Sequence, residues 1–218
     1  MPFCVTTLIE EPLRFAAAAA ALILAIGWHE FSHVFVAFSL GDPTGRQAGR
    51  LTLNPLKHLD PIGTLLIFVG AFIGWGKPAP FNPANLRYRR YGSALVALGG
   101  PLSNLFLFTL ASLVLRVLYP SLGPENMMVV FLQYLTLINV SLLLFNLLPL
   151  PPLDGSWLLL ALFPRAVNIQ TFYQRYGAFV LLTVIIIDFG LDIPIISPYL
   201  ITGASWLISI IGIGPYLF

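Results

Sequence analysis

The chain has 218 residues, of which 58% are hydrophobic and only 9% are charged, and its mean hydropathy is +0.88. Soluble domains carry about a quarter charged residues, so this composition excludes an ordinary soluble domain, and it also excludes a disordered chain. The net charge of +2 gives no indication of nucleic-acid binding. The single cysteine, Cys4, excludes an internal disulfide and a cysteine-rich metal site. The remaining class is a polytopic membrane protein.

Five stretches are apolar and long enough to cross a bilayer, which takes about 20 helical residues. They are 13–40, 91–118, 127–148, 172–189 and 199–217. The first has no small-residue cleavage site after a short apolar core, so we expect a retained helix and not a signal peptide. A sixth stretch, 61–75, is shorter and contains three glycines.

The connections 41–60 and 76–90 carry most of the lysine and arginine residues, which places both on the cytoplasmic side. Residues 61–75 must then enter and leave on the same side, as a re-entrant hairpin does. We predict an all-α polytopic membrane protein with five spans and this hairpin, the N-terminus outside and the C-terminus inside. Six full spans are the alternative. Residues 50–53 could form a short strand, and the whole chain reads as one membrane domain, 1–218.

The first span contains His29, Glu30 and His33 in the order His-Glu-Phe-Ser-His. Residues at positions i and i+4 lie on one face of a helix, so the two imidazoles can hold one zinc ion. Glu30 can then face the water bound to that metal and act as general base. The structural alternative is that these residues pair with other polar groups in a helix bundle. Ionisable groups inside a span are costly and usually functional, which favours the metal site.

A catalytic zinc usually takes three protein ligands and leaves one position for water. The candidates for the third ligand are Asp42, His58, Asp60, Glu125, Asp154, Asp188 and Asp192. Asp154 fits best, because it follows prolines that break a helix at membrane depth, where exposed backbone needs a polar cavity. It could equally be the N-cap of the next short helix. His58 is the next candidate, since histidine is the commonest metal ligand.

These motifs resemble the site-2 protease family of intramembrane zinc metalloproteases. The resemblance lies in the pattern HExxH at 29–33 and NxxPxPxLDG, which runs from Asn146 to Gly155 here. Residues 99–104 resemble the start of the family's intervening helix, and residues 54–63 and 74–83 resemble a compact prokaryotic subgroup without a PDZ-like insertion. The resemblance covers about residues 20–165.

The resemblance implies that His29, His33 and Asp154 ligate one zinc ion and that Glu30 activates its water. The catalytic core would then occupy about 13–165, with accessory spans at about 172–217. For the developing oxyanion we select Asn146 as the donor, with helix-end capping as its alternative and Asn104 as a weaker candidate.

The expected partner is a membrane-protein substrate whose transmembrane helix unwinds and pairs with an exposed edge near 50–53 or 74–80. We expect a multi-pass protein of the cell membrane with its active site towards the cytoplasm. The alternatives are a catalytically silent zinc protein that binds transmembrane helices, a metal transporter and an enzyme that hydrolyses lipids. One broken helix without a second half argues against the transporter. The sequence gives no oligomeric state.

Overall fold

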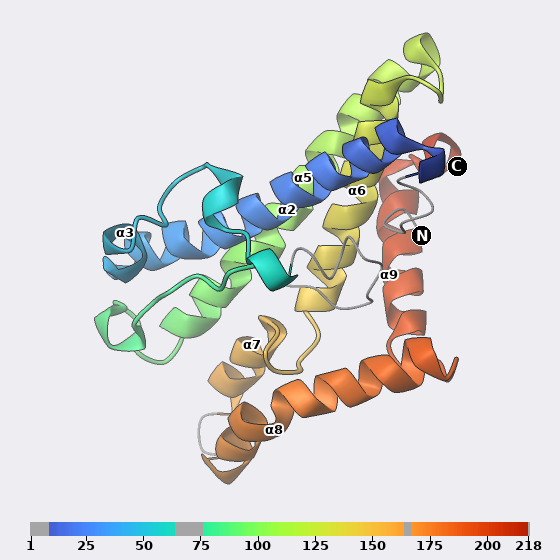
Figure 1. The fold of residues 1–218 in the computed structure, drawn as a ribbon. Coiled ribbons are helices and arrows are strands. Elements are labelled where there is room, and N and C mark those ends of the chain that lie inside the picture. The colour runs from blue at the N-terminus through green and yellow to red at the C-terminus, as the bar shows by residue number, and fades with distance from the viewer. Residues whose placement is uncertain (1–8, 64–75, 164–166, 218) are drawn as a thin grey trace.

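The computed structural model describes residues 9–63, 76–163 and 167–217, and its regular structure is almost entirely helical (Figure 1). Three long helices pack together, namely α2 (Pro12–Ser39), α5 (Gly92–Leu122) and α6 (Met127–Asn146). After α6 come α7 (Gly155–Leu162), α8 (Val167–Ile185) and α9 (Ser197–Ile211). The short elements are α3 (Thr44–Gln47), η1 (Pro55–Lys57), η2 (Pro83–Asn85), the π-helical turn η3 (Ile186–Gly190) and η4 (Gly214–Tyr216).

The three long helices confirm three of the predicted spans. Helices α2, α5 and α6 have 28, 31 and 20 residues and are apolar throughout their central windows. At 1.5 Å per residue even the shortest is about 30 Å long, which matches the hydrocarbon core of a bilayer. Helix α9 is apolar but has only 15 residues. A total of five or six spans is therefore not confirmed.

The C-terminal part of the chain departs from the predicted topology. Helix α9 runs antiparallel to α6, because Gly203 lies against Leu144 near the end of α6, while Gln133 near its start donates to the Tyr216 carbonyl oxygen at 2.7 Å. The rings of Tyr119 and Tyr216 also lie 5.2 Å apart. The C-terminal turn therefore lies beside the connection between α5 and α6.

We predict that connection outside and the C-terminus inside. The structure puts both at the same end of the bundle, so the prediction that they lie on opposite sides is wrong. The reason is the position of α8. Leu181 and Ile185 of α8 pack in one buried cluster with Leu148 and Leu153 of the loop after α6 and with Ile196 just before α9. Helix α8 thus covers that loop, and α9 then returns alongside α6.

Small residues bring α2 close to its neighbours. Ala18, Ala21 and Ala25 recur at helical spacing on one face of α2 and are completely buried. Small side chains allow helix backbones to approach closely, which is how helices associate where lipid removes the hydrophobic drive. The same face continues towards the C-terminal end of α2 as His29 and His33, so the close packing carries both imidazoles into the interior.

The predicted hairpin 61–75 lies mostly outside the described residues, but the residues at its two borders lie within them. Leu59 and Gly76 form an isolated antiparallel bridge, and the Lys77 amide donates to the His58 carbonyl oxygen at 2.8 Å. The chain therefore returns to the point from which it left, as a hairpin requires. Six full spans would put residues 59 and 76 on opposite faces of the bilayer, about 30 Å apart, and do not fit this pairing. Residues 50–53 form no strand.

Asp42 joins the loop after α2 to the loop before α5. Its buried carboxylate accepts hydrogen bonds from the Thr44 hydroxyl at 2.6 Å, the Asn82 amide at 2.7 Å and the Asn85 side chain at 2.8 Å. Burial alone would raise the pKa of Asp42, but these hydrogen bonds outweigh it and lower the pKa below the ordinary value of 3.8. The ionised form is therefore the one that holds the two loops together.

We expect Asp42→Asn to lower the free energy of unfolding by about 1.5–3 kcal/mol at pH 7, because hydrogen bonds to a charged group are lost. The measurement is thermal unfolding in detergent across a pH series. Since the folded pKa is depressed, the stabilisation is complete above the unfolded pKa of about 3.9 and is lost as the pH falls through the folded value. The difference between the proteins should shrink below about pH 4. Exposed Asp192, changed to Asn, is the control, and an equal loss there would contradict the prediction.

Candidate metal centre

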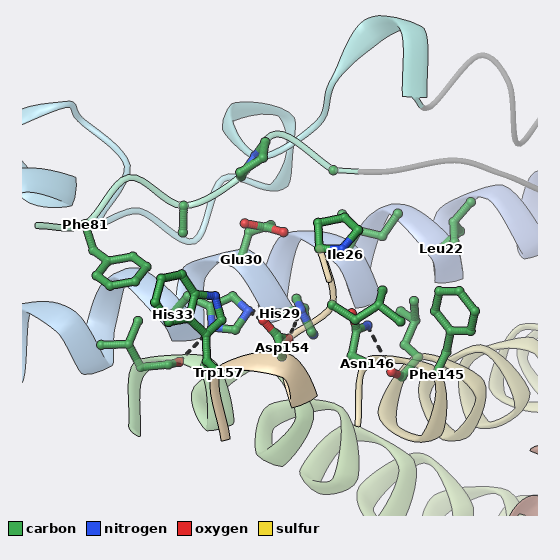
Figure 2. A pocket seen from close by; sticks show the side chains of 18 residues that line it. Leu22, Ile26, His29, Glu30, His33, Phe81, Phe145, Asn146, Asp154 and Trp157 are labelled. Atoms are coloured by element: carbon green, nitrogen blue, oxygen red, sulfur yellow. Dashed lines mark hydrogen bonds and ion pairs between the residues drawn. The ribbon is translucent and has the colours of Figure 1, made fainter. Parts of the chain in front are cut away.

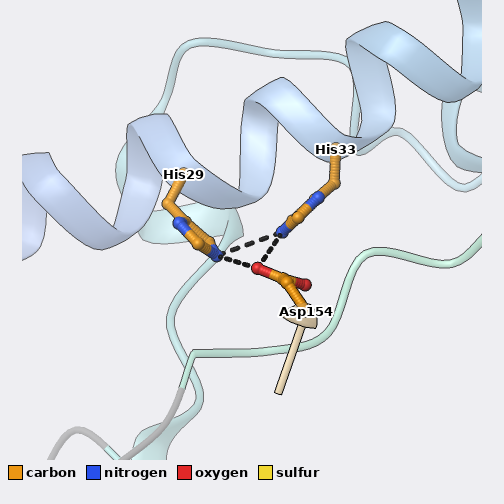
Figure 3. Close-up of side chains that lie close together, drawn as sticks. All are labelled: His29, His33 and Asp154. Atoms are coloured by element: carbon orange, nitrogen blue, oxygen red, sulfur yellow. Dashed lines mark hydrogen bonds and ion pairs between the residues drawn. The ribbon is translucent and has the colours of Figure 1, made fainter. Parts of the chain in front are cut away.

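Three donor atoms from distant parts of the chain converge inside the helix bundle (Figure 3). The Nε2 atoms of His29 and His33 lie 3.0 Å apart. The Oδ2 atom of Asp154 lies 3.2 Å from His29 Nε2 and 3.3 Å from His33 Nε2. The two histidines are buried and the aspartate is nearly so. The structure thus brings Asp154 together with the imidazole pair, as the sequence predicts.

These distances can be compared with those around a tetrahedral metal ion. Zinc binds imidazole nitrogen and carboxylate oxygen at about 2.0–2.2 Å, so two ligand atoms on a zinc tetrahedron lie about 3.3–3.5 Å apart. The three measured separations fall between 3.0 and 3.3 Å. Two imidazoles and one carboxylate are also a typical donor set for a catalytic zinc with one open position. The residues therefore fit a zinc ion.

Asp154 reaches the histidines because the chain turns sharply after α6. Asp154 stands at the N-cap position of α7, yet its side chain makes no capping hydrogen bond. Its Oδ2 atom is buried, accepts no hydrogen bond from the part of the chain that the structure describes, and faces the two imidazoles. The next residue must be glycine, because a Cβ on Gly155 would collide with the carbonyl oxygens of Leu147 and Leu148. The geometry thus favours the metal-ligand reading of Asp154 over the helix cap.

Helix α5 supports the imidazoles from behind. A Cβ on Gly100 would lie 2.5 Å from His33 Nε2 and 2.6 Å from His29 Nε2, closer than real carbon atoms approach. The neighbouring Gly99 faces the Ser32 carbonyl oxygen, 3.0 Å from the position of a Cβ. The two glycines therefore let the α5 backbone lie directly against α2, Gly100 beside the donor atoms and Gly99 beside the Ser32 backbone.

The Nδ1 atom of each histidine has its own partner. His33 Nδ1 lies 2.8 Å from the Val96 carbonyl oxygen, and His29 Nδ1 lies 2.6 Å from Asn104 Oδ1. Both acceptors come from α5. An acceptor at Nδ1 holds the proton there and leaves the Nε2 lone pair free for a metal. Asn104, the weaker candidate for the oxyanion donor, therefore contacts the Nδ1 atom of His29, on the opposite edge of the ring from the Nε2 donor atom.

Glu30 faces a cavity in front of the three donor atoms (Figure 2). The cavity has a volume of about 350 Å³ and is lined by α2, the start of α5, the end of α6, the turn around Asp154 and the segment 76–81. The Oε2 atom of Glu30 is buried and has no hydrogen-bond partner among the described residues. Gly76 lies beside Glu30, with the Cγ atom 3.4 Å from the position of a Cβ on the glycine. A buried carboxylate with free lone pairs is suited to accept a proton.

His58, the second candidate for the third ligand, is engaged elsewhere. Its Nε2 atom lies 2.9 Å from the Thr52 carbonyl oxygen, and its Nδ1 atom lies 3.5 Å from the guanidinium of Arg50. Burial lowers the pKa of His58, and the charge of Arg50 acts in the same direction. Arg50 also donates to the Lys77 carbonyl oxygen at 2.6 Å. His58 and Arg50 therefore hold together the two chain segments at the borders of the predicted hairpin.

Among the acidic candidates other than Asp154, four have structural partners and Asp192 is exposed. Asp60 accepts from the Gly63 amide at 2.8 Å, Glu125 pairs with Arg14 at 2.7 Å, and Asp188 accepts from the backbone amides before and at the start of α9. Asp42 and Asp192 were described above. None of these five joins the donor group formed within the described residues.

Asn146 lies at the end of α6 and lines the same cavity as Glu30 and Asp154 (Figure 2). Its Nδ2 atom donates one hydrogen bond to the Leu142 carbonyl oxygen of its own helix at 3.0 Å. An amide nitrogen carries two hydrogens, so one donor is left over from this contact. Its position fits the helix-end role and still leaves a donor at the edge of the cavity.

The fold and the site together define a helical membrane protein with a buried three-donor metal centre and an adjacent glutamate.

The model of peptidase family M50 matches residues 123–187, which include the turn with Asp154. The predicted zinc metalloprotease YwhC of Bacillus subtilis is 38% identical over 179 residues, which cover 78% of this chain and 80% of that protein. The predicted zinc metalloprotease Rip2 of Mycolicibacterium smegmatis is 30% identical over 211 residues, 93% of this chain and 77% of that protein. No solved structure matches.

These matches confirm the resemblance carried by the two motifs. The chain belongs to peptidase family M50, the site-2 protease family.

We expect Gly100→Ala to abolish metal binding, because the added methyl group would occupy the space beside both Nε2 atoms. The measurement is the metal content of the purified protein by mass spectrometry. Gly203→Ala is the matched control, since a Cβ there meets only the flexible side chain of Leu144 and lies outside the site. A Gly100→Ala protein with a full complement of metal would show that the imidazoles sit differently from the arrangement described.

Proposed function

We propose that this chain is an intramembrane zinc metalloprotease that hydrolyses a peptide bond within or near a transmembrane helix of its substrate. The observation that carries the proposal is the convergence of three ligand atoms beside Glu30, inside a bundle of helices long and apolar enough to span a membrane. The Oε2 atom of Glu30 is buried and has no hydrogen-bond partner among the described residues. The names of the relatives support the zinc metalloprotease class. An intact Glu30 argues against a catalytically silent protein, which would have no need of a base.

Zinc is the cofactor, and we assign His29, His33 and Asp154 as its ligands. When bound, zinc lowers the pKa of a coordinated water and polarises a carbonyl group. The side chains of the site supply the remaining requirements. Gly100 leaves room for the donor atoms, and the acceptors at Val96 and Asn104 direct both Nε2 lone pairs to one point.

Glu30 is assigned as the general base. It precedes His33 by less than one helical turn, so its carboxylate faces the same cavity as the donor atoms. The carboxylate takes a proton from the attacking water and later delivers it to the nitrogen of the departing amine, which balances the hydrolysis. The Oε2 atom has no hydrogen-bond partner among the described residues and is therefore free to perform this transfer.

Asn146 is assigned as the donor to the developing oxyanion. Its amide lies on the same cavity as Glu30, at the point where α6 ends and the chain turns towards Asp154. Its hydrogen bond to Leu142 fixes the direction of the amide, so the second N–H needs no reorganisation during the reaction.

A substrate helix must unwind before it can react, because each of its carbonyl groups is hydrogen-bonded within the helix. Gly76, Pro78, Ala79 and Phe81 lie along the cavity in a segment that is neither helix nor strand, and Gly76 at its start is paired with Leu59. An extended peptide can add to such a segment by backbone hydrogen bonds. We propose that the unwound part of the substrate lies here.

The active site is assigned to the cytoplasmic side of the cell membrane. His33 lies six residues before the end of α2 at Ser39, about 9 Å along the helix. The loops at this end of α2 and at the start of α5 carry the following basic residues: Arg46, Arg50, Lys57, Lys77, Arg87, Arg89 and Arg90. Basic residues in short loops mark the cytoplasmic side.

Glu30→Gln should abolish cleavage of a single-span substrate in detergent, by at least the 10²- to 10⁴-fold that a general base contributes, while zinc stays bound. His29→Ala and Asp154→Ala should lose zinc and activity together. Cleavage and zinc content are measured on the same preparations. Exposed Glu125, changed to Gln, is the control for removing a carboxylate.

Each outcome of this experiment has a defined meaning. Cleavage that survives in Glu30→Gln would refute the assigned base. A wild-type protein that holds one zinc ion but cleaves no substrate would favour the catalytically silent alternative, and zinc flux into vesicles would favour a transporter.

Asn146→Ala should lower kcat by about 10²- to 10³-fold, as the loss of one oxyanion donor does, with zinc content and KM nearly unchanged. Kinetics with a peptide from the substrate's cleavage region test this. An equal fall in zinc content would show instead that Asn146 only holds the turn that carries Asp154.

A further inference from the structure

Three buried amide and carbonyl groups form a line that ends at the ring of His29. Asn104 Oδ1 lies 2.6 Å from His29 Nδ1, Asn104 Nδ2 donates to Asn139 Oδ1 at 2.8 Å, and Asn139 Nδ2 donates to the Leu135 carbonyl oxygen at 2.7 Å. Both asparagines are completely buried, Asn104 on α5 and Asn139 on α6. Water cannot replace any of these contacts at such positions.

The direction of every hydrogen bond in this line follows from its far end. A backbone carbonyl oxygen can only accept, so Asn139 must present its NH₂ group to Leu135. Its Oδ1 atom then faces Asn104, so the NH₂ group of Asn104 must donate the hydrogen bond between them. The Oδ1 atom of Asn104 is thereby turned towards His29, and the ring must carry its proton on Nδ1.

The alternative orientation shows why this matters for a metal ligand. If the Asn104 amide turned over, its NH₂ group would face Nδ1, which must then be the unprotonated nitrogen. The proton would sit on Nε2, and that atom would have no lone pair for a metal. With Asn139 in place, a reversed Asn139 amide would instead put two oxygens 2.7 Å apart at Leu135.

The other ligand does not need such a line. His33 Nδ1 faces the Val96 carbonyl oxygen, a backbone group that accepts and cannot be turned over. The tautomer of His33 is therefore set directly by α5, whereas that of His29 depends on a side chain whose own orientation must be determined.

We infer that Asn139 is a positioning residue for the metal centre and that it acts through Asn104, holding His29 in the tautomer whose Nε2 atom can ligate a metal. The inference rests on the proposed role of His29 as a zinc ligand. Asn139 lies outside both sequence motifs and touches neither the cavity nor the donor atoms.

The test replaces Asn139 by leucine, which has a similar shape and no polar atoms, and measures the zinc dissociation constant by chelator competition in detergent. We expect affinity to fall about 10- to 100-fold, as it does when outer partners of a metal-bound histidine are lost. A second readout is the Nδ1–H signal of His29 in protein labelled with ¹⁵N-histidine, which contains only three histidines. This signal should weaken or disappear in Asn139→Leu.

The double variant Asn104→Asp with Asn139→Leu separates positioning from packing. A carboxylate presents only acceptors to His29, so it needs no orientation by residue 139 and should restore both the affinity and the Nδ1–H signal. The control is Thr136→Val, one turn away on α6, equally buried, with a hydroxyl that has no hydrogen-bond partner among the described residues. It should leave both readouts unchanged.

Unchanged zinc affinity and an unchanged Nδ1–H signal in Asn139→Leu would overturn the inference, as would a double variant that is no better than Asn139→Leu alone. Either result leaves the proposed function standing as long as the wild-type protein binds zinc. A wild-type protein with no measurable zinc affinity would instead remove the proposed function, and this inference with it.

Discussion

The contact between the Asp154 carboxylate and the two imidazoles of α2 is the constraint on which the rest of the structure depends. A carboxylate buried in an apolar bundle is expensive unless it has a partner, and here its partners come from a helix more than 100 residues earlier in the sequence. The contact requires α2 to pack closely against the glycines of α5. It also requires α6 to end at Asn146, so that the turn after it can carry Asp154 to the histidines. The close packing of α2 and the break after α6 are therefore both needed to bring Asp154 to the two imidazoles.

Much of this site could be predicted because its chemistry is local. His29 and His33 are four residues apart on one helix, and Asp154 follows prolines that end a helix at membrane depth. Position alone leaves Asp154 equally open to a metal-ligand and a helix-capping role, and the family motif selects the ligand. The basic loops also predict correctly that residues 59 and 76 lie on one side. These features depend on spacing and charge, which are visible without a structure.

What the sequence does not reveal depends on contacts between helices. Apolar residues in 172–189 are expected to face lipid as a span, but in α8 several of them cover the loop after α6, and hydrophobicity is the same for both surroundings. The sequence does not predict the role of Asn139 either. A single asparagine in an apolar helix gives the same pattern whether it joins two helices or positions a metal ligand. His58 shows the reverse case, a plausible metal ligand that fastens a loop.

If the chain cleaves a transmembrane helix as proposed, the depth of the donor atoms along α2 would decide the fate of the two products. A substrate helix lying alongside α2 and cut level with His33 would be divided unequally, with a stub of about six residues on one side and nearly the whole span on the other. The stub would retain too little apolar length to stay in the bilayer and would pass into the water, whereas the longer fragment would keep its membrane anchor. The position of two histidines near one end of a helix would thus decide which half of a severed protein is set free.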